Sequence, residues 1–112
     1  MEKNVPVNMK RPHLDDLPVF DPPDEYLLSW YATGDVETWV AVQQQAENYL
    51  TISRHLFSSE FGDREDELGR RQCFLWTREG APVATATGWF TGDDPSSPAG
   101  RVHWVAVVPD HQ

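Results

Sequence analysis

The spacing of apolar residues changes along the chain and predicts where helices and strands lie. Residues 25–31 form a short aromatic and aliphatic run that is typical of a strand. Between residues 36 and 50, apolar side chains recur every three or four positions, which predicts a helix with one buried face and with Asp35 as its N-cap. A second helical stretch is expected after Ser53, and residues 63–69 read as an acidic turn or short helix closed by its glycine.

Three further strands are predicted in quick succession. They cover residues 72–77, 82–90 and 101–108. A glycine-containing turn at 78–81 and a loop rich in Gly, Asp, Pro and Ser at 92–100 separate them. Because short connections join neighbouring strands of opposite direction, we expect an antiparallel meander.

The last of these strands has an unusual pattern. Residues 104–108 are apolar at five successive positions, without the alternation of a strand that has one wet face. Such a run is typical of a strand that is covered on both faces. The sequence therefore predicts a central strand, and it predicts that part of its cover comes from outside these 112 residues.

The first 24 residues differ from the rest because they contain five prolines and little apolar periodicity. Proline fixes φ and removes a backbone donor, so this segment is predicted to be an extended arm. The apolar residues Leu14, Leu17, Val19 and Phe20 give the arm something to bury. The predicted organisation is an arm at 1–24 and a folded region at 25–112.

Charge and composition exclude several classes of protein. The net charge is −9 and the nine basic residues are scattered, so no nucleic-acid partner is expected. The acidity could attract a cationic amine or only aid solubility. No apolar run is long enough to cross a bilayer, the start carries no secretory signal, and the single Cys73 permits no internal disulfide, so a cytoplasmic protein is expected. The four histidines lack metal-ligand spacing, so no metal is expected.

The order of strand, two helices and meander, followed by the apolar segment Val105–Val108, the bend at Pro109 and then Gln112, resembles the N-terminal half of the GNAT superfamily of N-acetyltransferases. In that family the apolar fourth strand leads through a proline-containing bend to a loop of the form Q/R-x-x-G-x-G/A. The resemblance covers about residues 25–112. It implies an α/β fold (α+β in some schemes) in which the last strand is central once the fold is complete.

The resemblance also implies an activity and a cofactor. The family transfers an acetyl group from acetyl-CoA to an amine by direct attack, without a metal. By position, the backbone of Val105, Ala106 and Val107 would bind the acetyl and pantetheine arm, and Gln112 would open the pyrophosphate loop. The glycine-rich remainder of that loop is not in the sequence, so the 112-residue chain alone is expected to have little or no activity.

Several side chains are candidates for the remaining chemistry. His103 could accept a proton near neutral pH, or it could simply fill a half-exposed strand position. Trp89, Trp104 and Asp94 are candidates for an acceptor pocket, although strand aromatics often belong to the core and a loop acid before proline often forms a turn. Cys73 has no basic neighbour and is expected to be an inert thiol.

Two expectations about partners follow. An exposed apolar last strand should pair through self-association or with a complementing C-terminal half. The rival hypothesis is a small acidic α+β interaction module without enzymatic activity. Its distinguishing feature would be a last strand that forms the edge of the sheet and has one solvated face.

Overall fold

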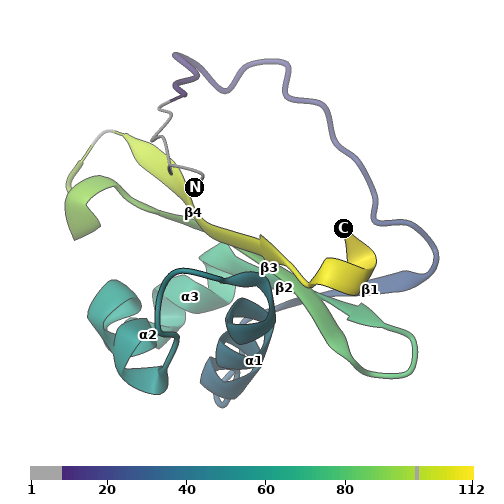
Figure 1. Cartoon of the computed structure of the whole chain (residues 1–112). Coiled ribbons are helices and arrows are strands. Elements are labelled where there is room, and N and C mark those ends of the chain that lie inside the picture. The colour runs from purple at the N-terminus through teal and green to yellow at the C-terminus, as the bar shows by residue number, and fades with distance from the viewer. Residues whose placement is uncertain (1–8, 98) are drawn as a thin grey trace, which may run out of the picture.

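The computed structural model describes residues 9–97 and 99–112, and within them the chain forms one antiparallel sheet with a layer of helices on one face (Figure 1). The elements in chain order are β1 (Tyr26–Trp30), α1 (Val36–Ala46), α2 (Arg54–Phe61), α3 (Glu65–Arg71), β2 (Gln72–Thr77), β3 (Pro82–Phe90), the short 3-10 turn η1 (Thr91–Asp93), β4 (Gly100–Val107) and the 3-10 turn η2 (Pro109–His111). This mixed helix and sheet architecture is the one the apolar spacing predicts.

The strand order is β1-β2-β3-β4, and each neighbouring pair is antiparallel. The predicted meander is thereby confirmed, and β1 extends it by pairing with β2. One row of paired residues crosses the whole sheet: Leu28, Leu75, Ala84 and Val107. Because side chains alternate along a strand, this row points away from the face that carries the helices.

The first helix is shorter than its apolar spacing suggests. It ends at Ala46, whereas the pattern predicts a helix to about residue 50. The side chain of Glu47 explains the difference, because its Oε1 accepts hydrogen bonds from the backbone N–H groups of Tyr49 (2.8 Å) and Leu50 (3.2 Å). A side chain that satisfies these donors offers the backbone an alternative to the helix. Tyr49 is 77% exposed as a result.

The predicted caps behave differently from one another. Ser53 caps α2 as expected, since its Oγ accepts from the backbone N–H of Leu56 at 3.2 Å. Asp35 stands at the N-cap of α1, but its carboxylate bonds the Ala32 N–H and the Thr38 hydroxyl, both at 3.0 Å, and not the helix backbone. Asp35 therefore ties the preceding turn to the helix.

The acidic segment forms a regular helix that continues past the predicted stop. Gly69 lies inside α3, and the helix runs to Arg71, directly before β2. Glu67 accounts for part of this extension because it pairs with Arg70 at 3.0 Å and with Arg71 at 2.9 Å across the last turn. Leu68 is buried beneath the helix and fixes its orientation on the sheet.

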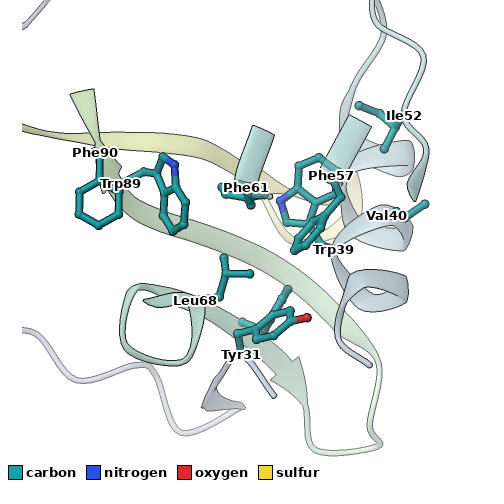
Figure 2. Packing of buried hydrophobic residues seen from close by; sticks show 10 residues of the cluster. Tyr31, Trp39, Val40, Ile52, Phe57, Phe61, Leu68, Trp89 and Phe90 are labelled. Atoms are coloured by element: carbon teal, nitrogen blue, oxygen red, sulfur yellow. The ribbon is translucent and has the colours of Figure 1, made fainter. Parts of the chain in front are cut away.

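Phe61 lies at the centre of the core. Its ring is fully buried, and its centroid lies 5.8 Å from that of Trp39, 5.2 Å from that of Trp89 and 5.7 Å from that of His103. Figure 2 shows Phe61 between Trp89 on one side and Trp39 with Phe57 on the other. One side chain from α2 thus contacts α1, β3 and β4.

The other face of the sheet is not covered by α1, α2 or α3, but the 3-10 turn η2 lies on it at one end, where His111 Nδ1 is 2.9 Å from the Tyr26 hydroxyl (Figure 1). The large apolar residues Leu28, Trp30, Val102 and Val105 are exposed. Along residues 104–108 the burial alternates: Ala106 and Val108 are buried, whereas Val105 is 60% exposed. β4 is also the outermost strand of the described sheet. Within the described residues the helices therefore cover one face of this strand, and the cover expected on its second face is absent.

Replacing the central aromatic residue tests the assignment of the core. Phe61→Ala is expected to lower the free energy of unfolding by about 3–5 kcal/mol, because it opens a cavity among four elements. Urea denaturation followed by circular dichroism measures the change. The matched control is Tyr49→Ala on the exposed segment after α1, which should change stability by no more than about 0.5 kcal/mol. Equal effects of the two substitutions would contradict this assignment.

Candidate functional site

The structure separates the predicted site residues into two groups and leaves Asp94 apart from both. Trp89, His103 and Trp104 lie on the helix-covered face of the sheet and contact the central aromatic cluster. Val105, Val107 and Gln112 belong to the free side of β4, which we call the β4 edge. Ala106 is buried between the two groups and packs with Val42 and Val83.

A β-bulge at the middle of β4 joins the two groups. His103 pairs with Thr87 and Ala106 pairs with Thr85, so Trp104 and Val105 together stand opposite Ala86. Trp104 has a φ of +52°, which is uncommon for any residue other than glycine. A bulge takes its residues out of the hydrogen-bonded ladder and redirects their side chains and backbone groups. Of the two described non-glycine residues with positive φ, Asp16 and Trp104, the second therefore lies directly before the segment that the resemblance assigns to the acetyl group.

Gln43 of α1 holds this bulge in place. Its side chain is almost fully buried, 2% exposed, and Nε2 donates a 2.9 Å hydrogen bond to the backbone carbonyl of Trp104. Trp39, one turn earlier on α1, packs edge-on against the Trp104 indole with 5.5 Å between ring centroids. Sequence reasoning missed Gln43. The available signal was an amide four residues after Trp39 on the otherwise apolar face of the helix.

The backbone at the β4 edge is partly occupied. The N–H of Val108 donates to Val83 of β3 at 2.9 Å, so by alternation the backbone groups of Val107 point to the opposite side, away from β3. There the Val107 carbonyl accepts a 3.0 Å bond from Nε2 of Gln112. Val105 lies outside the paired register of β3 and β4. The edge therefore presents backbone groups around Val105 and Val107, with Gln112 folded back onto it.

His103 lies beside a carboxylate that sequence reasoning did not single out. Its Nε2 is 3.8 Å from Oε2 of Glu60, and its side chain is 11% exposed. The ring also packs against Phe61 of α2 and neighbouring Trp104. The two side chains therefore lie within ion-pair distance of each other, between β4 and α2. In the sequence, the only indication of Glu60 is its position directly before Phe61, a predicted apolar residue of the second helix, and this is a weak one.

The remaining candidates lie where structural roles explain them. Asp94 is exposed and accepts hydrogen bonds from Ser96 Oγ at 2.7 Å and Ser96 N at 2.9 Å, which lower the pKa of its carboxyl. This is the turn-forming role weighed for it. Trp89 is buried in the core. Burial raises the pKa of the Cys73 thiol, in line with an unreactive side chain.

The indoles of Trp39 and Trp104 have a further property in common. Both Nε1–H groups are buried and have no hydrogen-bond partner among the described residues. Their rings touch at the bulge. Buried donors that lack partners are uncommon in folded proteins, and here both occur at one contact.

A half-open pocket of about 210 Å³ lies elsewhere, where α1, α2 and α3 approach the end of β1. Its walls include Tyr31, Phe57, Asp63 and Glu65. None of the site residues that the sequence predicts lines this pocket. The Tyr31 hydroxyl donates to Glu65 Oε1 at 3.1 Å. Burial, followed by that bond and the charge of Glu65, raises the pKa of Tyr31 to about 12.

Neither a metal site nor a membrane span emerges from the described part of the chain. No group of three or more His, Cys, Asp or Glu residues there could hold a metal ion. None of the described helices is both long and apolar enough to span a bilayer, and α1, the longest, has 11 residues.

Removing the amide that holds the bulge should destabilise the protein. Gln43→Leu leaves the Trp104 carbonyl without its buried donor, and we expect a loss of about 1–3 kcal/mol in the free energy of unfolding. The matched control is Gln45→Leu, because Gln45 is exposed and bonds only the Ala41 carbonyl of its own helix. Urea denaturation compares the variants, and a loss no larger than that of the control would contradict the assigned role of Gln43.

The tyrosine in the half-open pocket should make stability fall at high pH. The folded pKa of Tyr31 is raised from 10.0 to about 12, so the folded state holds this proton more tightly than the unfolded chain. The corresponding stabilisation is complete below pH 10 and is lost as the pH rises towards 12. Ultraviolet absorbance of tyrosinate measures the titration. Glu65→Gln should lower the raised pKa, whereas Glu79→Gln in the β2–β3 turn should not.

The chain was compared with protein families, curated proteins and solved structures. No protein-family model matches the chain, and neither a curated protein nor a solved structure matches it.

Proposed function

We propose that this chain is the N-terminal half of an acyl-CoA-dependent N-acetyltransferase of the GNAT type. The observation that carries the proposal is the bulged β4 with Val105 outside the ladder, in a mixed helix and sheet chain that has three helices, where the resemblance implies two, before the meander. A bulge at the fourth strand supports the proposal because it frees backbone hydrogen-bonding groups in the segment assigned to the acyl group.

The reaction requires three contributions from the protein, which follow from its chemical steps. The lone pair of the amine nitrogen attacks the thioester carbonyl carbon, and the carbonyl oxygen becomes an oxyanion. The C–S bond then breaks, the nitrogen loses a proton, and the thiolate of CoA takes one up. The protein must therefore stabilise the oxyanion, accept the proton of the amine and hold the pantetheine arm in reach.

In this proposal the backbone at the β4 edge binds the acyl donor. The N–H groups of Val105 and Val107 act on the acetyl oxygen and the amides of the pantetheine arm. Fixed backbone donors suit an oxyanion because they need no reorganisation as the charge develops. Gln112 leaves Val107 and opens the pyrophosphate loop in the complete protein.

His103 is the proposed proton acceptor, with Glu60 as the carboxylate that stabilises its protonated form. His103 immediately precedes the bulge, which supports a role next to the acyl group. Its position 3.8 Å from Glu60 supports the charge pairing. Trp104 contributes the wall between this pair and the edge, and the proposal assigns no catalytic role to Asp94 or Trp89.

The partners follow from the same surface. The acyl acceptor is an amine, and neither a nucleic acid nor a membrane is part of the proposal. A strand edge with available backbone groups recruits another strand, so β4 pairs with a complementing C-terminal half or with a second copy. The 112 residues alone are proposed to lack significant turnover, because they contain no glycine-rich pyrophosphate loop.

One observation favours the rival function, a small acidic interaction module. β4 is the outermost strand of the described sheet, and Val105 on it is exposed to solvent. This is the distinguishing feature expected of that module. The bulge at Trp104 favours the acetyltransferase. A residue other than glycine with φ near +52° costs about 1–2 kcal/mol, and a role in binding the acyl group would account for that cost.

Binding of the acyl-donor arm separates the two functions. We expect S-acetyl-pantetheine, added to isotope-labelled protein, to shift the amide resonances of Val105, Ala106 and Val107 in two-dimensional NMR spectra. Val105→Pro removes one edge donor and should weaken binding by roughly fivefold, the equivalent of about 1 kcal/mol for a hydrogen bond. The matched control, Val102→Pro, removes a donor from the same strand outside the bulge and should bind normally.

The same spectra report whether each variant is folded. A chain that shows no shift at residues 105–107 would support the interaction module and contradict the acetyltransferase. Normal binding by a folded Val105→Pro variant would show that the bulge is not the acyl site.

A further inference from the structure

We propose that the N-terminal arm is a strap whose segment Leu17–Phe20 closes across the bare face of the sheet. The bare face is the one opposite α1, α2 and α3; η2 contacts Tyr26 at one end of it, and its central row is Leu28, Leu75, Ala84 and Val107. The inference rests on the arm and the sheet alone and does not depend on acetyl transfer.

The bare face offers an apolar surface with small side chains at its middle. Val83, Thr85, Thr87 and Trp89 of β3 are buried under the helices, so alternation places Ala84, Ala86 and Gly88 on the bare face. A side-chain carbon added at Gly88 would meet nothing within 4 Å. Larger apolar residues flank this strip: Leu28 and Trp30 on β1, and Val102 and Val105 on β4.

The arm carries the matching apolar side chains. Val19 is 91% exposed and Phe20 is 84% exposed, and Leu17 is about half exposed, at 47%. In Figure 1 the arm runs on the side of the sheet away from α1, α2 and α3. Two exposed apolar surfaces of one chain, the arm segment and the bare face, therefore lie on the same side of the sheet.

The base of the arm is fixed at the correct end of the sheet. Arg78 Nε donates to the carbonyl of Asp24 at 2.6 Å, and the N–H of Tyr26 donates to the carbonyl of Pro23 at 3.0 Å. Tyr26 pairs with Thr77, two residues along each strand from the row that crosses the bare face. The arm therefore begins beside the row that it is proposed to cover, at the end of the face where His111 of η2 contacts Tyr26.

The length of the arm matches the width of the sheet. Adjacent strands lie about 4.8 Å apart, so β1 and β4 are separated by about 14 Å. An extended proline-rich chain advances about 3.1 Å per residue, which puts Phe20 about 9 Å and Leu17 about 19 Å from Pro23. The segment Leu17–Phe20 thus reaches from the middle of the sheet to β4.

Two further properties favour the arm over a second copy of the chain as the occupant. Pro18, Pro22 and Pro23 already restrict the arm to extended conformations, so closure loses less conformational entropy than it would for a flexible segment. The arm is tethered, which gives it an effective concentration on the order of millimolar. A second copy must instead bring together two chains that each carry a net charge of −9.

A spin label on the arm tests the closure in the full chain. Cys73→Ser removes the single native cysteine, and Val19→Cys then carries a nitroxide label. We expect the methyl resonances of Leu28, Leu75 and Val107 to lose most of their intensity. The matched control places the label at Tyr49→Cys, on the exposed segment between α1 and α2, and should broaden these resonances much less than the label at residue 19.

Two results would overturn the strap. Unbroadened methyl resonances on the bare face with the label at residue 19 would mean that the arm stays open. In a second sample, spin-labelled chains without methyl labels are mixed with methyl-labelled chains without a spin label. Broadening of the methyl resonances in this mixture would mean that a second copy covers the face. A second variant guards against an effect of the label: Val19→Ser with Phe20→Ser should increase the fluorescence of a dye that binds apolar surface, whereas Tyr49→Ser should not increase it.

Discussion

The packing of Phe61 is the interaction on which the rest of the structure depends. One ring from α2 touches Trp39 of α1, Trp89 of β3 and His103 of β4, so the helical layer and two strands share a single contact point. The bulge in β4 follows from this arrangement, because α1 is held close enough for Gln43 to reach the Trp104 carbonyl. The aromatic cluster therefore fixes the backbone geometry of the β4 edge from the opposite side of the strand.

Much of the fold could be predicted from local pattern. The short connections between strands predicted the meander, and a serine before an apolar run predicted the cap of α2. Both features depend on residues that lie close together in the sequence. The predicted end of α1, at about residue 50, was wrong. The side chain of Glu47 accepts hydrogen bonds from backbone N–H groups, and the spacing of apolar residues carries no information about such bonds. Gly69 does not stop α3, because pairing of Glu67 with two arginines and burial of Leu68 outweigh the low helix propensity of glycine.

The candidate site could be predicted only in part, for a different reason. The sequence singled out the segment 103–107 as a candidate, but the bulge depends on how β4 pairs with residues of β3 that lie 16–21 positions earlier. Gln43 and Glu60 were missed because their relation to Trp104 and His103 arises from packing between α1, α2 and β4. Asp94 could be explained locally, since its partner Ser96 is two residues away. Long-range contacts are what single-sequence reasoning does not supply.

The bond between Gln112 and the Val107 carbonyl also bears on how readily other chains can stack on β4. A bare outer strand is a template on which other chains can stack, and β4 has neither lysine nor proline to discourage them. The glutamine amide occupies one acceptor of that template, and the bulge breaks its regular repeat a few residues earlier. An incoming strand must therefore displace an existing partner and match an irregular register, which makes the edge selective about what it accepts.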